Sequence, residues 1–268
     1  MSKNIIVKPA FGTREWASHN ENLINGCSND CRYCYAKAMA SRFKRKTSDN
    51  WKDEIINKSK LDKQFKKKQG RFMFPTTHDI TPDNLDWCMA YLENILKAGN
   101  EVLIVSKPHP ECIQTMCEKF MPYRQQILFR FTIGSTDNTT LKFWDQNAPS
   151  FDKRLEALQY AFGMGFATSV SCEPLLDNNA DELIRQVRPY VTDAIWLGKV
   201  NMIISRLKIN GFGDQETMGK AKALMGDLSE SYINELYTRY RNDSKIKWKD
   251  SFKKVIGIPM QTDPGRDI

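Results

Sequence analysis

The 268-residue sequence has no run of 18 apolar residues, which excludes a membrane-spanning helix. Its first ten residues lack the apolar segment of a secretory signal, and this predicts a cytoplasmic protein. A glycine-rich phosphate loop, a serine-triad pattern and an HExxH pair are also missing. P-loop nucleotide hydrolysis, serine hydrolysis and HExxH zinc proteolysis therefore have no support in the sequence.

Positive charge is in excess and is concentrated in two stretches. The chain has 40 Lys and Arg against 32 Asp and Glu, a net charge of +8. Residues 42–68 carry +7 (eleven basic, four acidic), and residues 239–254, where aromatics are interleaved, carry +5 (seven basic, two acidic). Such stretches suit a polyanion with stackable bases, and the candidate nucleic-acid contacts are Lys66, Lys67, Lys68, Lys247 and Trp248. A solvated lysine-rich loop and an ordinary helix face would give the same pattern.

Short β-rich runs alternate with helical patterns along most of the chain. The runs are mostly apolar, as in parallel strands covered on both faces, and lie at 22–25, 71–75, 101–106, 126–134, 166–173 and 194–200. Helical patterns lie at 35–45, 83–98, 110–120, 151–163 and 179–190. This alternation of six strand runs with five helical patterns predicts an α/β fold with a parallel sheet, open or curled into a partial barrel. The expected core is 1–200 with a Lys-rich insertion at about 44–70, followed by a helical, basic C-terminal extension at 201–268.

Three of the seven cysteines are packed into eight positions, Cys27, Cys31 and Cys34, with C-x3-C-x2-C spacing. The odd total argues against a disulfide framework. Thiolates this close repel one another unless a cationic centre compensates them, so the spacing favours a metal. Structural zinc needs a fourth ligand, for which His19 is the nearby candidate. An iron–sulfur cube held by three thiolates would leave one iron open instead.

The cysteine segment, with Tyr33 at its aromatic position, resembles the signature of radical S-adenosylmethionine (radical SAM) enzymes. Further segments are similar to the spore photoproduct lyase and DNA-repair-photolyase-like branch of that superfamily: 22–27, 34–37, 75–80, 102–107, 129–133 and 147–157. The resemblance implies a partial (β/α)6 TIM-type barrel whose three cysteines hold a [4Fe–4S] cluster, with S-adenosylmethionine on the open iron. It also implies reductive cleavage to a 5′-deoxyadenosyl radical, which abstracts hydrogen from a substrate, and an external one-electron donor such as flavodoxin or ferredoxin.

The resemblance further implies which residues contact S-adenosylmethionine. They are Tyr33 and Trp196 near the adenine, Thr132 and Ser135 at the ribose, Thr76 and Thr77 near the methionine amino group, and Lys107 at the methionine carboxylate. Each residue type also has an ordinary structural use, as a helix cap, a solvated lysine or a core tryptophan.

The resemblance breaks at the place of the lyase's hydrogen-donating cysteine, which lies just before a T-S-D-I-like run. Aligning that run on residues 77–80 puts Thr76 there, and a hydroxyl O–H is too strong to return a hydrogen atom as a thiol does. Standard lyase activity is therefore not expected. Tyr35, which is retained, is a candidate radical relay. Cys172 is a second candidate catalytic residue, whose thiol follows a strand; a buried inert thiol is the alternative.

The sequence thus predicts a radical SAM enzyme that modifies or repairs a nucleic acid or nucleotide. One alternative is a radical SAM enzyme acting on a protein or peptide, which would show radical chemistry without nucleic-acid affinity. The other is a non-catalytic, metal-bound nucleic-acid-binding module, which would bind nucleic acid in a salt-sensitive way without cleaving S-adenosylmethionine.

Overall fold

A computed structural model describes residues 10–265 and is built around a parallel sheet of seven strands within that range. The strands follow the sheet order β1 (His19–Asn20), β4 (Phe72–Phe74), β5 (Val102–Ser106), β6 (Ile127–Thr132), β7 (Ala167–Cys172), β8 (Ile195–Leu197) and β9 (Ile246–Trp248). Every neighbouring pair is parallel. The two ends of the sheet, β1 and β9, are not paired with each other, so the predicted α/β partial barrel is confirmed.

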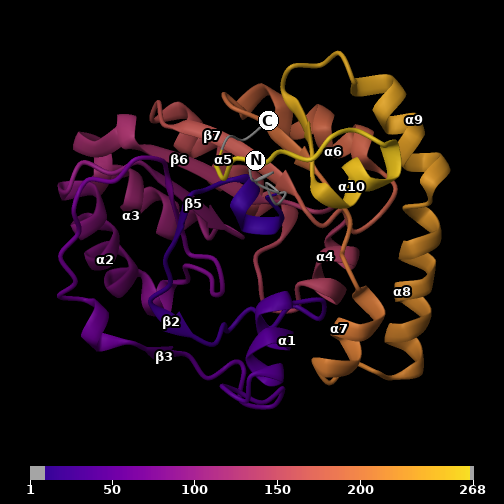
Figure 1. Ribbon diagram of the computed structural model, residues 1–268, viewed down its shortest axis with the longest axis horizontal. Coiled ribbons are helices and arrows are strands. Elements are labelled where there is room, and N and C mark those ends of the chain that lie inside the picture. Colours follow the sequence, from indigo (N-terminus) through magenta and orange to yellow (C-terminus); the bar gives the residue numbers. More distant parts are fainter. Residues whose placement is uncertain (1–9, 266–268) are drawn as a thin grey trace, which may run out of the picture.

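Helices connect successive strands, and a last helix follows β9 (Figure 1). They are α1 (Tyr35–Arg42), α2 (Leu85–Lys97), α3 (Pro110–Phe120), α4 (Asn138–Trp144), α5 (Phe151–Gly163), α6 (Ala180–Val187), α7 (Ile203–Ile209), α8 (Gln215–Asp227), α9 (Glu230–Tyr240) and α10 (Asp250–Ile256). In Figure 1, α2 and α3 lie on one side of the molecule, α7, α8 and α9 on the other, and α1 between them. None of the helices within 10–265 has the length and apolar character needed to cross a bilayer.

Side chains alternate between the two faces of the curved sheet, as the period of two requires. Phe74, Phe129 and Val170 pack in the large core beneath the helices. Met73 and Trp196 point the other way and gather inside the barrel. Each face therefore has its own hydrophobic cluster. Alternate residues along a strand point into different clusters.

Two expectations about the sheet are wrong. The run at 22–25 is not the first strand of the barrel: it contains β2 (Ile24–Asn25), which forms an antiparallel pair with β3 (Ile55–Ile56). The first barrel strand is β1, whose two residues are too few to give a periodic signal. The C-terminal segment is also more than helical, since β9 adds a seventh strand beside β8.

Residues 239–254, the second basic stretch, contain β9, and the burial of this strand limits which of these residues a ligand could contact. Trp248 is 7% exposed and its ring packs against Tyr237 and Phe252, with centroids 5.4 and 6.2 Å away. A nucleic-acid base has no access to this ring, so the predicted stacking role of Trp248 is wrong. Lys247 alternates with it on β9 and is half-buried.

Candidate functional site

A cavity of about 570 Å³ opens at the carboxyl ends of the strands, where parallel α/β sheets place their ligands. One part of its wall is the cysteine loop and the start of α1. The loops after β4, β5 and β7 form the middle. The opposite part comes from the N-terminal segment around Trp16 and from residues 199–206. The volume lies within the usual range for small-molecule and cofactor sites.

Where the cysteine loop begins, its backbone passes close to the backbone of residues 51–53. Gly26 has a φ of +110°, and a Cβ there would lie 2.8 Å from the main-chain oxygens of Trp51 and Asp53. Asp30, between the first two cysteines, also takes a left-handed φ of +44°, and its carboxylate forms a 2.7 Å ion pair with Lys37 of α1. Asp is among the residues that tolerate this conformation. The loop is therefore closed by a local charge pair.

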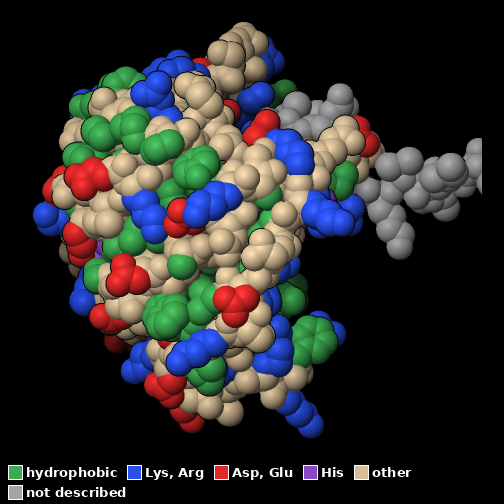
Figure 2. All heavy atoms as spheres, turned by 90° about the vertical axis from the view of Figure 1, so that its left-hand side faces the viewer, with side chains coloured by type: hydrophobic (Ala, Val, Ile, Leu, Met, Phe, Trp, Pro, Cys, Tyr) green, Lys and Arg blue, Asp and Glu red, His purple; other side chains and the backbone are tan. Residues whose placement is uncertain are grey.

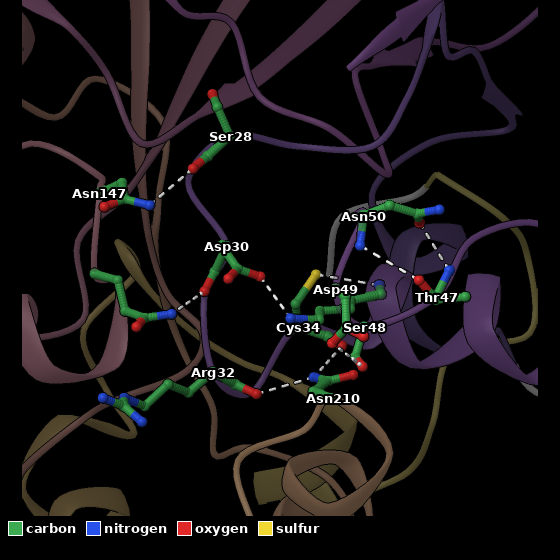
Figure 3. Close-up of polar contacts among 12 residues, drawn as sticks. Ser28, Asp30, Arg32, Cys34, Thr47, Ser48, Asp49, Asn50, Asn147 and Asn210 are labelled. Carbon is green, nitrogen blue, oxygen red and sulfur yellow. Dashed lines mark hydrogen bonds and ion pairs between the residues drawn. The ribbon is translucent and has the colours of Figure 1, made fainter. Parts of the chain in front are cut away.

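Distant segments fix the same loop from outside (Figure 3). Asn147 donates a 3.0 Å hydrogen bond to the Ser28 carbonyl, and Gln146 donates one of 2.6 Å to the Asp30 carbonyl. Asn210, at the end of α7, donates bonds of 2.9 Å to the carbonyls of Arg32 and Cys34. The carbonyls between and beside the cysteines are thus satisfied by the protein, which holds the loop rigid.

The three thiols fit a shared cationic group. Cys27, Cys31 and Cys34 all line the cavity, and none forms a disulfide. Burial raises the pKa of the Cys31 thiol well above its usual range, and the nearby Cys34 and Cys27 add to the effect. Three neighbouring thiols that oppose one another's ionisation are stabilised as thiolates when a metal compensates them.

The alternative of a zinc site completed by His19 does not fit. The His19 ring bonds the Gln69 carbonyl at 3.0 Å, packs on Phe72 and does not line the cavity. Among residues 10–265, no group of three or more His, Cys, Asp or Glu side chains is arranged to hold a single metal ion.

Asp79 joins the cysteine loop to two strand ends. Its buried carboxylate accepts hydrogen bonds from Asn29 at 2.9 Å, from Ser106 at 2.5 Å and from the Lys107 main chain at 3.0 Å. Burial raises the pKa of Asp79, although Lys107 and these donors act against that rise. Asp79 lies in the 75–80 segment, where sequence reasoning considered the threonines and missed this carboxylate.

Lys107 faces the cavity within a set of acidic groups. Its Nζ lies 5.8 Å from the centroid of the Tyr33 ring. Burial alone would lower the pKa of Lys107, but Cys31 and Tyr33, followed by Asp145 and Asp79, hold it well above its usual value. The Asp145 carboxylate accepts a 2.5 Å hydrogen bond from the Tyr33 hydroxyl and forms a 2.8 Å ion pair with Arg154. Lys107 therefore stays cationic where a carboxylate of a bound molecule can reach it.

Most of the residues predicted for the cofactor come together in this cavity. The lining includes Cys27, Cys31, Cys34, Tyr33, Tyr35, Thr76, Thr77, Lys107 and Thr132. Asn22 orients the two threonines: its side-chain oxygen accepts from their main-chain N–H groups at 2.7 and 2.8 Å. Tyr35 donates its hydroxyl hydrogen bond to the Thr76 carbonyl.

Three predicted site residues lie elsewhere. Cys172 is fully buried in the core beneath the helices, because its parity on β7 turns it away from the cavity, so its predicted catalytic role is wrong. The Ser135 hydroxyl is buried against Asp177 and does not reach the cavity wall. Trp196 packs against Trp16 inside the barrel, at a centroid distance of 5.8 Å, and does not line the cavity either.

The exposed lysines of the insertion lie at the other end of the barrel. The Lys68 main chain donates a 2.8 Å hydrogen bond to Asn100, and Lys67 contacts the Gly99 carbonyl. Gly99 and Asn100 precede β5, so Lys66, Lys67 and Lys68 lie by the amino ends of the strands. On the face over α2 and α3, basic side chains are interspersed with acidic ones (Figure 2). Ion pairs from Glu93 to Lys97 and Lys119 are examples of this pairing.

A buried charge cluster on the opposite wall was missed from the sequence. Lys249 is fully buried, with its Nζ 2.5 Å from Glu15 and 3.4 Å from Glu173. The same ammonium lies 4.1 Å from the centroid of the Trp16 ring. Glu173 lines the cavity, and burial raises its pKa while Lys249 acts against that rise. No short motif marks this cluster, because its members come from three distant parts of the chain.

Comparison of the sequence with protein-family models identifies the superfamily of the chain. The family model of the radical SAM superfamily matches residues 22–188, more than half of the chain. The chain belongs to the radical SAM superfamily. It is therefore a radical SAM enzyme, and this superfamily uses a [4Fe–4S] cluster and S-adenosylmethionine. No curated protein sequence matches the chain.

The fold is similar to solved structures of spore photoproduct lyase. A tyrosine-to-phenylalanine mutant of that enzyme aligns with a TM-score of 0.56 at 14% identity, over 91% of this chain and 79% of the lyase. A cysteine-to-alanine mutant with a dinucleoside spore photoproduct aligns with a TM-score of 0.52 at 15% identity, over 78% of this chain and 64% of the lyase. This chain thus spans about two-thirds of that lyase. Likeness at this identity shows the fold alone.

Replacing Lys107 with methionine is expected to weaken binding of S-adenosylhomocysteine by about 10- to 100-fold, the usual effect of removing a charge-assisted hydrogen bond. Calorimetry on the anaerobic, cluster-loaded protein measures this directly. Lys119→Met is the control, since Lys119 is an exposed residue of α3 outside the cavity. Equal affinity in both variants and the wild type would remove Lys107 from the cofactor site.

Proposed function

We propose that this radical SAM enzyme acts on a nucleic acid or nucleotide, which it modifies or repairs. The observation that carries the proposal is the fold likeness to spore photoproduct lyase, one of whose structures has both AdoMet and a dinucleoside spore photoproduct bound. The net positive charge of the chain supports a polyanionic substrate. We also propose a cytoplasmic location and a flavodoxin or ferredoxin as electron donor, since seven free cysteines suit a reducing compartment.

The chain's own residues have three tasks in this reaction. Cys27, Cys31 and Cys34 would hold the cluster, and Lys107 and Thr132 would orient S-adenosylmethionine within the cavity. Once bound, these groups supply a 5′-deoxyadenosyl radical that takes hydrogen from the substrate. The hydrogen bonds that hold the cysteine loop keep the three thiols in position. With these groups bound, the cavity wall would shield a reactive intermediate from water and from side reactions.

The hydrogen-atom chemistry is expected to differ from that of the lyase. Thr76 stands where the lyase-like pattern has a cysteine, and its hydroxyl already accepts a 2.5 Å hydrogen bond from Asn22. Cys172 faces away from the cavity. Tyr35 lines the cavity beside Cys34, and a phenolic O–H is weaker than an alcohol O–H. We therefore assign Tyr35, and not a thiol, as the candidate hydrogen relay.

Alanine at Lys66, Lys67 and Lys68 together is expected to leave nucleotide binding in the cavity unchanged, because these lysines lie at the amino ends of the strands. The same variant should bind long DNA less tightly, with a salt slope shallower by about 0.9 for each phosphate that the protein no longer neutralises. Fluorescence anisotropy at several salt concentrations measures both effects. An unchanged slope with DNA would show that this stretch does not contact the polyanion.

The substrate assignment is tested by assaying 5′-deoxyadenosine with the reduced, cluster-loaded enzyme in the presence of short DNA, RNA or an unrelated peptide. Stimulation by nucleic acid alone is the expected result. Stimulation by peptide alone would overturn the assignment and leave the radical SAM activity intact.

A further inference from the structure

Besides Lys107, two cations on the cavity wall are left without a polar partner by the described part of the chain. Lys199 follows β8, Arg206 lies on α7, and both line the cavity. Within residues 10–265, neither side chain makes a hydrogen bond or ion pair. The fully buried cations near the site differ from these two half-buried ones. Lys37 is paired with Asp30, Arg154 with Asp145 and Lys249 with Glu15.

The backbone holds both cations toward the cavity. The Lys199 main chain donates a 3.0 Å hydrogen bond to the Ser251 hydroxyl. Met202 has a left-handed φ of +56° and caps the start of α7, whose last turn carries Arg206. A non-glycine residue in this region is strained, and such strain is typical of functional turns. The Arg206 guanidinium lies 6.0 Å from the centroid of the Tyr35 ring, which borders the cysteine loop.

The acids nearby do not neutralise this pair. Glu173, on the same wall, lies 3.4 Å from Lys249, and Asp250 lies 3.4 Å from Lys254. Burial lowers the pKa of the Arg206 guanidinium, and Glu173 is among the groups that act against this. The uncompensated charge of this wall is therefore positive. An anion bound here would satisfy donors that the described residues leave open.

Lys199 also lies apart from Lys107 along the sheet. Lys107 follows β5 and Lys199 follows β8, three positions along the sheet. At about 4.8 Å between neighbouring strands, their strand ends lie roughly 14 Å apart along the curve of the sheet. The two lysines therefore belong to different parts of the cavity wall. The cavity thus has room for a second anion besides the methionine carboxylate assigned to Lys107.

We propose that Lys199 and Arg206 form an anion-binding subsite that takes a phosphate group of the substrate. The inference rests on the proposed nucleotide substrate, and it names the part of that substrate that this wall recognises. Arginine suits the role because its planar guanidinium binds two phosphate oxygens at once. The subsite would place the sugar and base of the nucleotide toward the cysteine loop.

The test compares wild type, Arg206→Gln and Lys199→Gln, each loaded with cluster and S-adenosylhomocysteine. Calorimetry measures binding of inorganic phosphate, of the dinucleotide thymidylyl-thymidine and, in a separate titration, of S-adenosylhomocysteine. Lys208→Gln is the matched control, because Lys208 lies on the same helix, is exposed and is outside the cavity. Arg206→Lys, which keeps the charge, guards against a simple folding defect.

Each glutamine variant is expected to weaken phosphate and dinucleotide binding by about 10-fold or more, the effect of removing one charged hydrogen bond. Affinity for S-adenosylhomocysteine should stay within 2-fold, and Arg206→Lys should retain part of the phosphate affinity. Loss of S-adenosylhomocysteine binding in the glutamine variants would show that these cations hold the cofactor and would overturn the proposal. Phosphate affinity that is absent in the wild type or the same in all variants would also overturn it. Arg206-dependent phosphate binding without dinucleotide binding would confirm the subsite and count against the nucleotide substrate.

Discussion

Replacing Cys31 with alanine is expected to abolish 5′-deoxyadenosine formation, with a loss of at least 100-fold. Cys31 is buried against the cavity, and the hydrogen bonds from Asn147, Gln146 and Asn210 fix the loop around it. Two thiolates cannot hold a cube that needs three protein ligands, so the bound iron should fall as well. Iron content, the visible absorbance of the cluster and product formation measure the effect.

Cys172→Ala is the matched control for this variant. Both cysteines are buried, but Cys172 points into the core beneath the helices. Its replacement should leave the iron content and the rate unchanged, at a cost in stability of roughly 1 kcal/mol for a small cavity. If Cys31→Ala kept its cluster and activity, or if Cys172→Ala lost them, the assignment of the cysteine loop would be wrong.

The second large effect is expected at Lys249. Lys249→Met removes the fully buried ammonium between Glu15 and Glu173 and leaves Glu15 with the more distant Lys253, at 3.9 Å. Breaking a buried ion pair by removing one partner costs about 3–5 kcal/mol in the free energy of unfolding. Urea denaturation of the metal-free protein measures the change, because it separates stability from cluster binding.

Two further variants make this prediction specific. Lys254→Met removes an exposed partner of Asp250 on the same helix and should cost less than about 1 kcal/mol. Adding Glu15→Gln to Lys249→Met should recover part of the lost stability, since the buried charge is then removed together with its partner. Equal destabilisation by Lys249→Met and Lys254→Met would contradict the picture of a buried charge cluster.

The cysteine motif could be predicted from the sequence because its ligands lie within eight positions. Helices with a clear apolar period were equally accessible: α3 and α5 have the bounds that their patterns predict. The placement of Lys199 and Arg206 on the cavity wall, and of the buried Lys249, could not be predicted. These residues come from a turn, a short helix and the end of a three-residue strand, none of which gives a periodic signal.

The failures at Cys172 and Trp248 have a different physical origin. Both residues lie on strands, where a shift of one position turns a side chain from one face to the other. Residues 166–173 mix apolar residues with threonine, serine and glutamate, and this composition alone does not say which residues face the barrel interior. Register had to come from the structure, where β7 pairs Val170 with Ile195 and Cys172 with Leu197.

The account depends most directly on a cluster at Cys27, Cys31 and Cys34 that cleaves S-adenosylmethionine. The deciding measurement is iron and sulfide analysis of the anaerobically reconstituted protein, followed by reduction with S-adenosylmethionine and assay of 5′-deoxyadenosine. About four irons per chain, with product formed by the wild type and not by Cys31→Ala, is the predicted result. Zinc in place of iron, with no cleavage of S-adenosylmethionine, would contradict it.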